Sequence, residues 1–237
     1  MKAAAFTLIE LLVVITVVAV VAALALPAYQ GVRINASQVI AAGSLRQLGM
    51  AGQMYLAEHA NVYWKFRADT AAGTTYWFGY ETAQSAVLPE GQRTVDYANG
   101  ALGPYSGGLR DVHPDPQFTR MGATFKPKFK NGYFPYGYNY LLPDTSHLAI
   151  PLLNKRVVFA TSAQVNTFQA PASPGHPMLE EFYLVDNFNV TASFRYRGRA
   201  LCTFADGSTG PLPPEPGSLD ARLPDGGVGK LPLENLK

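Results

Sequence analysis

The chain has little of what a protein needs to cross-link itself or to hold a metal through sulfur. Cysteine occurs once in 237 residues, at Cys202, which excludes an intramolecular disulfide and a cysteine-based zinc cluster. The four histidines are scattered, and none is followed four residues later by a second one, so a histidine zinc site is not expected. We expect Cys202 to be a small buried residue in an apolar strand.

Charge is also scarce, and this limits the classes of function. Only 15% of the residues are charged, the net charge is +2, and no run of lysine and arginine occurs. The chain therefore lacks the basic surplus with which proteins neutralise phosphates, and no nucleic-acid partner is expected. Neither a G-x-S-x-G nucleophile elbow nor a phosphate-binding loop occurs. Because no acid, base and nucleophile can be named together, we expect no enzyme.

One long apolar run is present, and it contains an acid near its start. Residues 6–27 are long enough to span a membrane, and Lys2 would keep the N-terminus cytoplasmic. A cleaved secretory signal and a plain membrane anchor both fit the run. Glu10 fits neither, since a carboxylate at membrane depth costs about 2.5–3.5 kcal/mol on insertion scales. A third interpretation must therefore supply a cation for Glu10.

The stretch "AFTLIELLVV", followed by "ALPAYQ", resembles the N-terminus of type IV pilins and of type II secretion pseudopilins. The resemblance implies that prepilin peptidase removes the leader, residues 1–5, by cutting between Ala5 and Phe6. Ala5 stands where the family usually has glycine. Phe6 would then be N-methylated, and Glu10 would pair with the N-terminal ammonium of a neighbouring subunit during assembly. The resemblance also implies a single-pass protein of the cytoplasmic (inner) membrane, with its head in the periplasm or outside the cell.

The helical pattern continues beyond the apolar run. Small and apolar residues recur at spacings of three and four, which predicts an amphipathic continuation over residues 28–60; they include Val39, Ile40, Leu48 and Gly52. Pro27 lacks a backbone donor and predicts a kink where the two halves meet. In pilin-like proteins the first half of such a helix is exposed or in the membrane, and the second half packs on an antiparallel β-sheet. We expect this α+β fold.

The rest of the chain reads as a loop-rich α+β head, residues 61–210, and a tail, residues 211–237. Aromatic, glycine and proline residues are frequent in the head, which favours short strands and turns. The tyrosine-rich stretch "NGYFPYGYNYLL" fits a stacking platform for bases or sugars, but packing inside the head is the simpler interpretation. The tail is rich in proline and glycine, so we expect it to be extended or disordered. Alternatively, its leucines could lie across the sheet or contact a neighbouring subunit.

A second stretch, "RYRGRALCTFADG", resembles a branch of prepilin-like proteins that carry a histidine, nine residues and then Asp-Gly near the C-terminus. Tyr196 occupies the histidine position, which favours a structural role because a tyrosine can still donate a hydrogen bond. Asp206 and Gly207 predict a two-residue hairpin turn. By analogy with some pseudopilins, a calcium site at Asp206 is an alternative, although the sequence shows no dense acidic loop. The family residues matched are Arg195, Gly198, Ala200, Phe204, Ala205, Asp206 and Gly207.

One further group deserves comparison with these. Asp111, His113 and Asp115 lie close together in "RDVHPDP" and could serve as catalytic or metal-binding groups. The two prolines in this stretch favour an exposed loop instead.

Two functions of different class follow. The first is a structural subunit, a pseudopilin or minor pilin-like protein that assembles with other pilin or pseudopilin subunits in a filament. The second is a membrane-tethered extracytoplasmic binding module, which uses the pilin leader only for export and anchoring. Glu10 distinguishes them, because polymer assembly requires its charge and tethered binding does not.

Overall fold

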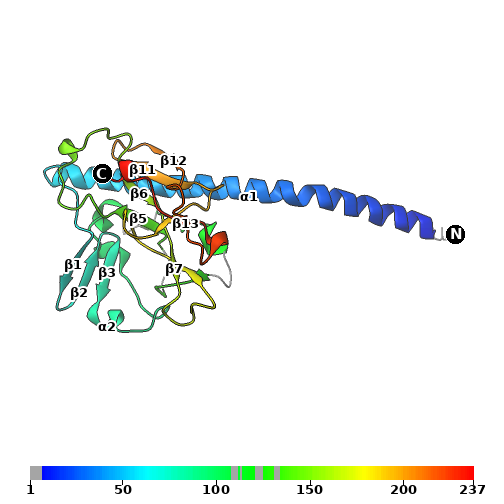
Figure 1. Ribbon diagram of the computed structural model, residues 1–237, viewed down its shortest axis with the longest axis horizontal. Coiled ribbons are helices and arrows are strands. Elements are labelled where there is room, and N and C mark those ends of the chain that lie inside the picture. The colour runs from blue at the N-terminus through cyan, green and yellow to red at the C-terminus, as the bar shows by residue number, and fades with distance from the viewer. Residues whose placement is uncertain (1–6, 108–111, 113, 121–124, 131–133) are drawn as a thin grey trace. The chain divides into compact units, whose positions relative to one another are not determined.

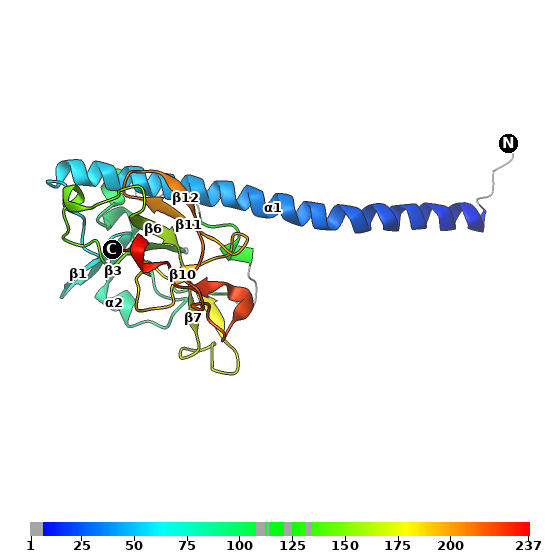
Figure 2. The same cartoon turned by 45° about the horizontal axis from the view of Figure 1, so that its top comes forward.

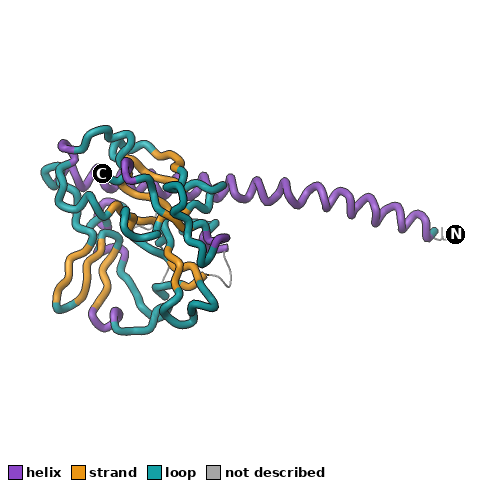
Figure 3. Tube along the Cα trace, in the orientation of Figure 1, coloured by secondary structure: helices purple, strands orange, loops and turns teal. Residues whose placement is uncertain are grey.

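The computed structural model describes residues 7–107, 112, 114–120, 125–130 and 134–237. Within them lie one long helix and a head of short strands joined by loops (Figure 3). The expected α+β class is confirmed. The chain divides into two compact units, Met1–Ser37 and Gln38–Lys237, and each unit is described separately below.

The helix α1 spans Leu8–Glu58, 51 residues in all. In the first unit, the side chains from Leu8 to Leu26 are all exposed. The helix continues without interruption through Pro27, so the proline does not end it. The kink expected at this position remains a prediction.

In the second unit, α1 packs closely on strand β11 (Ala200–Phe204), and Figures 1 and 2 both show this strand beside the helix. Leu45 is fully buried, and its carbonyl oxygen accepts a hydrogen bond of 2.8 Å from Thr203 Oγ1. At Gly49, a Cβ atom would lie 2.7 Å from the Thr203 methyl group, so a larger residue would push helix and sheet apart. Small side chains therefore set the contact distance.

The face of α1 that packs on the sheet agrees only in part with the expected one. Leu48 and Gly52 are buried, as expected. Val39 and Ile40 were also expected on the buried face, but both are exposed, while Ala41 and Ser44 are buried. At this point of the helix the close approach of the sheet favours small side chains over large ones.

The largest sheet has five strands in the order β12-β11-β6-β5-β9. Its neighbouring strands are antiparallel except for β5 and β9, which are parallel. Every residue of β6 and β11 is buried, which explains why these segments read as continuous apolar runs. The strands other than β11 are β5 (Tyr136–Asn139), β6 (Val157–Thr161), β9 (Leu184–Val185) and β12 (Thr209–Leu212).

Three smaller sheets complete the described part of the head. The first is a meander of β1 (Arg67–Thr70), β2 (Gly73–Tyr76) and β3 (Gly79–Thr82), followed by the short helix α2 (Ala83–Ala86). The second has the order β4-β8-β7, with β4 (Phe125–Lys126), β7 (Gln164–Asn166) and β8 (Met178–Glu180). The third pairs β10 (Ala192–Ser193) with β13 (Val228–Gly229).

The core of the head is largely aromatic. Trp64 stacks on Tyr138 and Phe159, with ring centroids 4.9 and 5.7 Å apart. Trp77 contacts Phe159 at 5.0 Å, and its indole N–H donates to the carbonyl oxygen of Tyr183 at 2.9 Å. Tyr136 and Tyr138, from the tyrosine-rich stretch, are fully buried, so these two tyrosines pack the core and offer no stacking platform.

The tail is folded, which corrects the expectation of an extended or disordered segment. Its strand β13 pairs with β10, and Leu231 and Leu236 are buried. Asn139 Nδ2 donates to the carbonyl oxygen of Leu236 at 3.0 Å. Burial of these leucines stabilises an order that proline and glycine content alone does not indicate.

The Asp206-Gly207 turn joins β11 to β12 as expected, but the loop is longer than two residues. The strands end at Phe204 and resume at Thr209, so four residues connect them. Gly207 adopts a left-handed conformation, φ +84°. Asp206 Oδ1 accepts hydrogen bonds from the amide and the hydroxyl of Ser208, at 2.9 and 2.6 Å. The aspartate closes its own turn by this local pair of bonds.

Candidate functional site

The N-terminus of α1 is capped by three reciprocal hydrogen bonds between Thr7 and Glu10. The amide N–H and the hydroxyl of Thr7 both donate to Glu10 Oε2 at 2.8 Å. The Glu10 N–H donates to the Thr7 hydroxyl oxygen at 3.2 Å. This is a capping box, in which the side chains at the first and fourth positions satisfy backbone donors that the helix leaves unpaired.

The capping box gives Glu10 a local role that the sequence reasoning missed, although the T-x-x-E spacing signals it. Its geometry also leaves one carboxylate oxygen available. Both Thr7 bonds end on Oε2, and among the described residues Oε1 accepts no hydrogen bond. Glu10 can therefore cap its own helix and still bind a cation.

The helix that carries Glu10 is long and apolar enough to cross a membrane. Its side chains from Leu8 to Leu26 are exposed and, apart from Glu10, none of them is charged. Ala5 and Phe6, the two residues of the expected cleavage site, lie outside the described residues.

A second group of predicted residues meets in the head. Asp115 is fully buried, which corrects the expectation of an exposed loop at this residue. Its Oδ2 accepts a hydrogen bond from Arg195 Nε at 2.9 Å, and its Oδ1 accepts one from the Tyr196 hydroxyl at 2.6 Å. Asp111 and His113 lie outside the described residues. Tyr196 thus pairs with an aspartate 81 residues away, and this partner could not be read from the sequence.

The group formed by Asp115, Arg195 and Tyr196 connects separate segments of the head through hydrogen bonds. Burial, with the Asp115 carboxylate next to it, raises the pKa of Tyr196 well above its usual value, so the hydroxyl stays protonated as a donor. Arg195 also donates to the carbonyl oxygens of Ser162 and Pro135, at 3.2 and 3.0 Å. These bonds tie the segment around Asp115 to the strands of the sheet, which supports the structural role expected for Tyr196.

The described residues include no group of three or more histidine, cysteine, aspartate or glutamate side chains arranged to hold a metal ion. Asp206 is engaged by Ser208 in its own turn, as described above. Cys202 is fully buried in β11, which confirms its expected place. Burial raises the pKa of the Cys202 thiol, so it stays an unreactive thiol.

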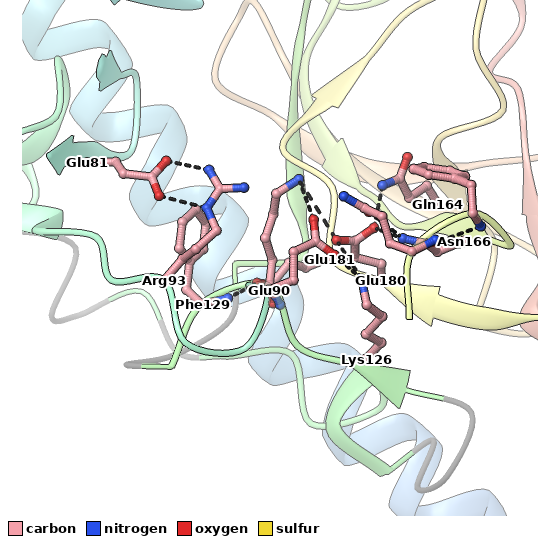
Figure 4. Close-up of polar contacts among 12 residues, drawn as sticks. Glu81, Glu90, Arg93, Lys126, Phe129, Gln164, Asn166, Glu180 and Glu181 are labelled. Atoms are coloured by element: carbon pink, nitrogen blue, oxygen red, sulfur yellow. Dashed lines mark hydrogen bonds and ion pairs between the residues drawn. The ribbon is translucent and has the colours of Figure 1, made fainter. Parts of the chain in front are cut away.

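A cluster of buried charges, shown in Figure 4, was not expected from the sequence. Lys126 on β4 pairs with Glu90 and lies 3.7 Å from Glu180 Oε1. Lys128 Nζ lies 3.7 Å from Glu90 Oε1 and 3.9 Å from Glu180 Oε1. The Glu180 side chain is fully buried, and its Oε2 also accepts from Gln164 Nε2 at 2.5 Å. Two ammonium groups therefore face two carboxylates.

Glu181 adds a third carboxylate to this cluster without a third cation. Its Oε1 accepts the backbone N–H bonds of Lys128 and Phe129, at 2.9 and 3.1 Å. Its Oε2 is buried without a hydrogen-bond partner among the described residues. Burial raises the pKa of Glu181 to about 8, despite the two backbone hydrogen bonds and Lys128, which act to lower the pKa. Near neutral pH the side chain is therefore mostly protonated, and the cluster is close to neutral.

The comparisons with known proteins concern the N-terminal segment. Residues 1–26 match the family described as the prokaryotic N-terminal methylation motif. The segment is thus of the type IV pilin and pseudopilin kind, and the motif implies processing by prepilin peptidase and assembly of pilin subunits in general. An apolar helix behind such a leader is compatible with membrane anchoring. No curated protein and no solved structure matches the chain.

Proposed function

We propose that this chain is a structural subunit, a pseudopilin or minor pilin-like protein of a type II secretion or type IV pilus-like filament. Prepilin peptidase cuts it between Ala5 and Phe6, and Phe6 becomes N-methylated. The N-terminal helix then holds it in the cytoplasmic membrane, N-terminus inside and head outside, until assembly. The observation that carries the proposal is the methylation motif over residues 1–26, which coincides with the apolar first part of α1, where Glu10 is the single acid. The chain acts as a substrate of processing enzymes and is not itself an enzyme.

The geometry of Glu10 supports this role. Its Oε2 is occupied by Thr7 and its Oε1 is available, so an ammonium group from a neighbouring subunit could bind without breaking the cap. Two opposite charges attract strongly where the dielectric constant is low. An unpaired carboxylate at membrane depth is costly, and this cost favours the assembled state over the isolated subunit.

Intact mass and N-terminal analysis of the chain, purified from membranes that contain the prepilin peptidase, tests the processing. We expect a chain that starts at methylated Phe6. A start at Met1 would leave only an anchored protein with a pilin-like leader. A start near Leu26 would mean an ordinary signal peptide and would remove the reason for Glu10.

Two matched variants separate the charge of Glu10 from its cap. Glu10→Gln removes the charge but keeps the capping box, because both glutamate and glutamine can accept the hydrogen bonds of the cap at this position. Thr7→Ala removes the threonine hydroxyl of the cap but keeps the charge. If the charge assembles the filament, Glu10→Gln abolishes cross-linking between subunits in membranes and Thr7→Ala largely preserves it. The opposite ranking would refute an assembly role for the charge.

The membrane-tethered binding module is the second candidate, and two hollows on the head favour it, as described below. Under this function, Glu10→Gln would leave export, anchoring and binding intact. The two functions do not exclude each other, since a filament subunit can also carry a binding head.

A further inference from the structure

Two adjoining hollows lie on the head. The first has a volume of about 700 Å³ and the second about 460 Å³. Lys65, Arg67 and Asp144 line both of them, so the two hollows are neighbours that share these charged residues. Each has a size typical of small-molecule sites.

The first hollow presents aromatic faces to solvent. Among the side chains whose exposure is described, four tyrosine or phenylalanine side chains are largely exposed, at Tyr29, Tyr140, Phe168 and Phe188. Two of them, Tyr140 and Phe188, line this hollow, with exposed fractions of 49% and 72%. Phe66 packs edge-on against Tyr140, with ring centroids 5.5 Å apart. The hollow therefore offers aromatic faces to a ligand.

The loop that presents Phe188 is fixed by a buried carboxylate. Asp186 Oδ1 accepts the backbone N–H bonds of Phe188 and Asn189, at 2.8 and 2.6 Å. Asp186 Oδ2 accepts a bond from Asn189 Nδ2 at 2.8 Å. The side chain of Asp186 is thus committed to holding the loop, so Phe188 is presented on a defined backbone.

The polar groups at the junction are available and mixed in charge. Asp144 is exposed and adopts a left-handed backbone conformation, φ +61°, which is uncommon outside glycine. Within the described residues, neither its carboxylate nor the Lys65 ammonium has a hydrogen-bond or ion-pair partner. Arg67 is half-exposed and pairs with Asp69 at 3.2 Å. The junction therefore offers acceptors and donors side by side.

We propose that the two hollows together bind a neutral oligosaccharide. A sugar ring has an apolar C–H face that packs on an aromatic side chain, and a rim of hydroxyls that each donate and accept hydrogen bonds. Tyr140 and Phe188 supply the faces, and Asp144, Lys65 and Arg67 supply the polar contacts. The balance of charge does not suit a polyanion, since a nucleic acid would require a basic groove. A ligand that occupies both hollows has more than one sugar ring. This inference goes beyond the filament role and does not depend on it.

Isothermal titration of the full chain tests the inference, in micelles of a detergent without a sugar headgroup, with cellotetraose and chitotetraose as probes. We expect binding of at least one tetrasaccharide, weakened about tenfold or more by Phe188→Ala. Phe168→Ala is the matched control, because this phenylalanine is similarly exposed but does not line either hollow. It should leave the affinity unchanged.

Asp144→Asn tests the polar side of the site. Asparagine tolerates the left-handed backbone of Asp144, so the variant should fold while weakening a hydrogen bond to a sugar hydroxyl. We expect a smaller loss of affinity than for Phe188→Ala. Absence of binding by both tetrasaccharides at millimolar concentration would overturn the inference. An equal loss in Phe188→Ala and Phe168→Ala would overturn it as well.

Discussion

Glu10 and Glu181 are carboxylates with mainly apolar or buried neighbours, and the two regions of the molecule accommodate them differently. Glu10 lies in an apolar helix, where Thr7 donates two hydrogen bonds to one of its carboxylate oxygens and the other oxygen is left available. Glu181 lies in the core of the head, where backbone N–H groups hold one oxygen and burial raises its pKa to about 8. In the head, burial favours the protonated, neutral form of the extra acid. In the proposed filament, by contrast, the acid of the helix would be compensated by an ammonium group of another subunit.

Removing a cation from the head should have the largest effect on stability. Lys126→Met leaves Glu90 and Glu180 with only the more distant Lys128, and breaking a buried pair costs about 3–5 kcal/mol. Urea denaturation of the full chain in micelles measures this loss. Lys155→Met, at an exposed lysine, is the control and should change stability by less than about 0.5 kcal/mol. A small effect of Lys126→Met would show that the cluster is hydrated.

The raised pKa of Glu181 predicts that the free energy of unfolding falls as pH rises, which is opposite in sign to the effect of an acid whose pKa is lowered on folding. Because its pKa is raised from 4.5 to about 8 in the folded state, its contribution to stability is complete below pH 4.5 and is lost as pH rises to about 8. Between pH 6 and pH 8 this loss is about 2 kcal/mol. Glu181→Gln should remove this slope in urea titrations. Parallel slopes for the two proteins would contradict protonation of Glu181.

Tyr196→Phe should cost less, about 1.5 kcal/mol, because it removes one hydrogen bond to the buried Asp115 and leaves the one from Arg195. The same urea denaturation measures it. Tyr80→Phe, at a partly exposed tyrosine of β3, is the comparison and should be nearly neutral. If Tyr196→Phe were as stable as the parent, the hydroxyl would have no structural role.

Thr7→Ala should have the smallest effect, about 1 kcal/mol on the first turn of α1, since it removes only a helix cap. Amide hydrogen exchange in micelles measures the loss of protection near Leu11. Glu10→Gln should preserve this protection. Equal loss in both variants would show that the carboxylate charge itself holds the turn.

The features that could be predicted from the sequence are those that depend on local patterns. The apolar helix that carries Glu10 and the α+β class were predictable because both follow from local patterns, whereas the assembly role of Glu10 stays a prediction. Asp115 and Tyr196 are 81 residues apart, and Lys126 is 54 residues from Glu180, so no short pattern links them. Val39 and Ile40 were misjudged because the packing distance of α1 depends on Thr203, in a strand far along the chain. The order of the tail depends in the same way on contacts such as Asn139 with Leu236.

The placement of the two tryptophans allows the folding of the head to be followed by intrinsic fluorescence. Trp64 and Trp77 are the chain's only tryptophans, and both are buried against Phe159 in the aromatic core. Their emission and near-ultraviolet dichroism therefore report on the folding of Gln38–Lys237. They are silent about the first turns of α1, where no tryptophan lies. A change of fluorescence on mixing with lipid or with other subunits would thus mean that the head itself had rearranged, while mere insertion of the apolar helix would leave the signal unchanged.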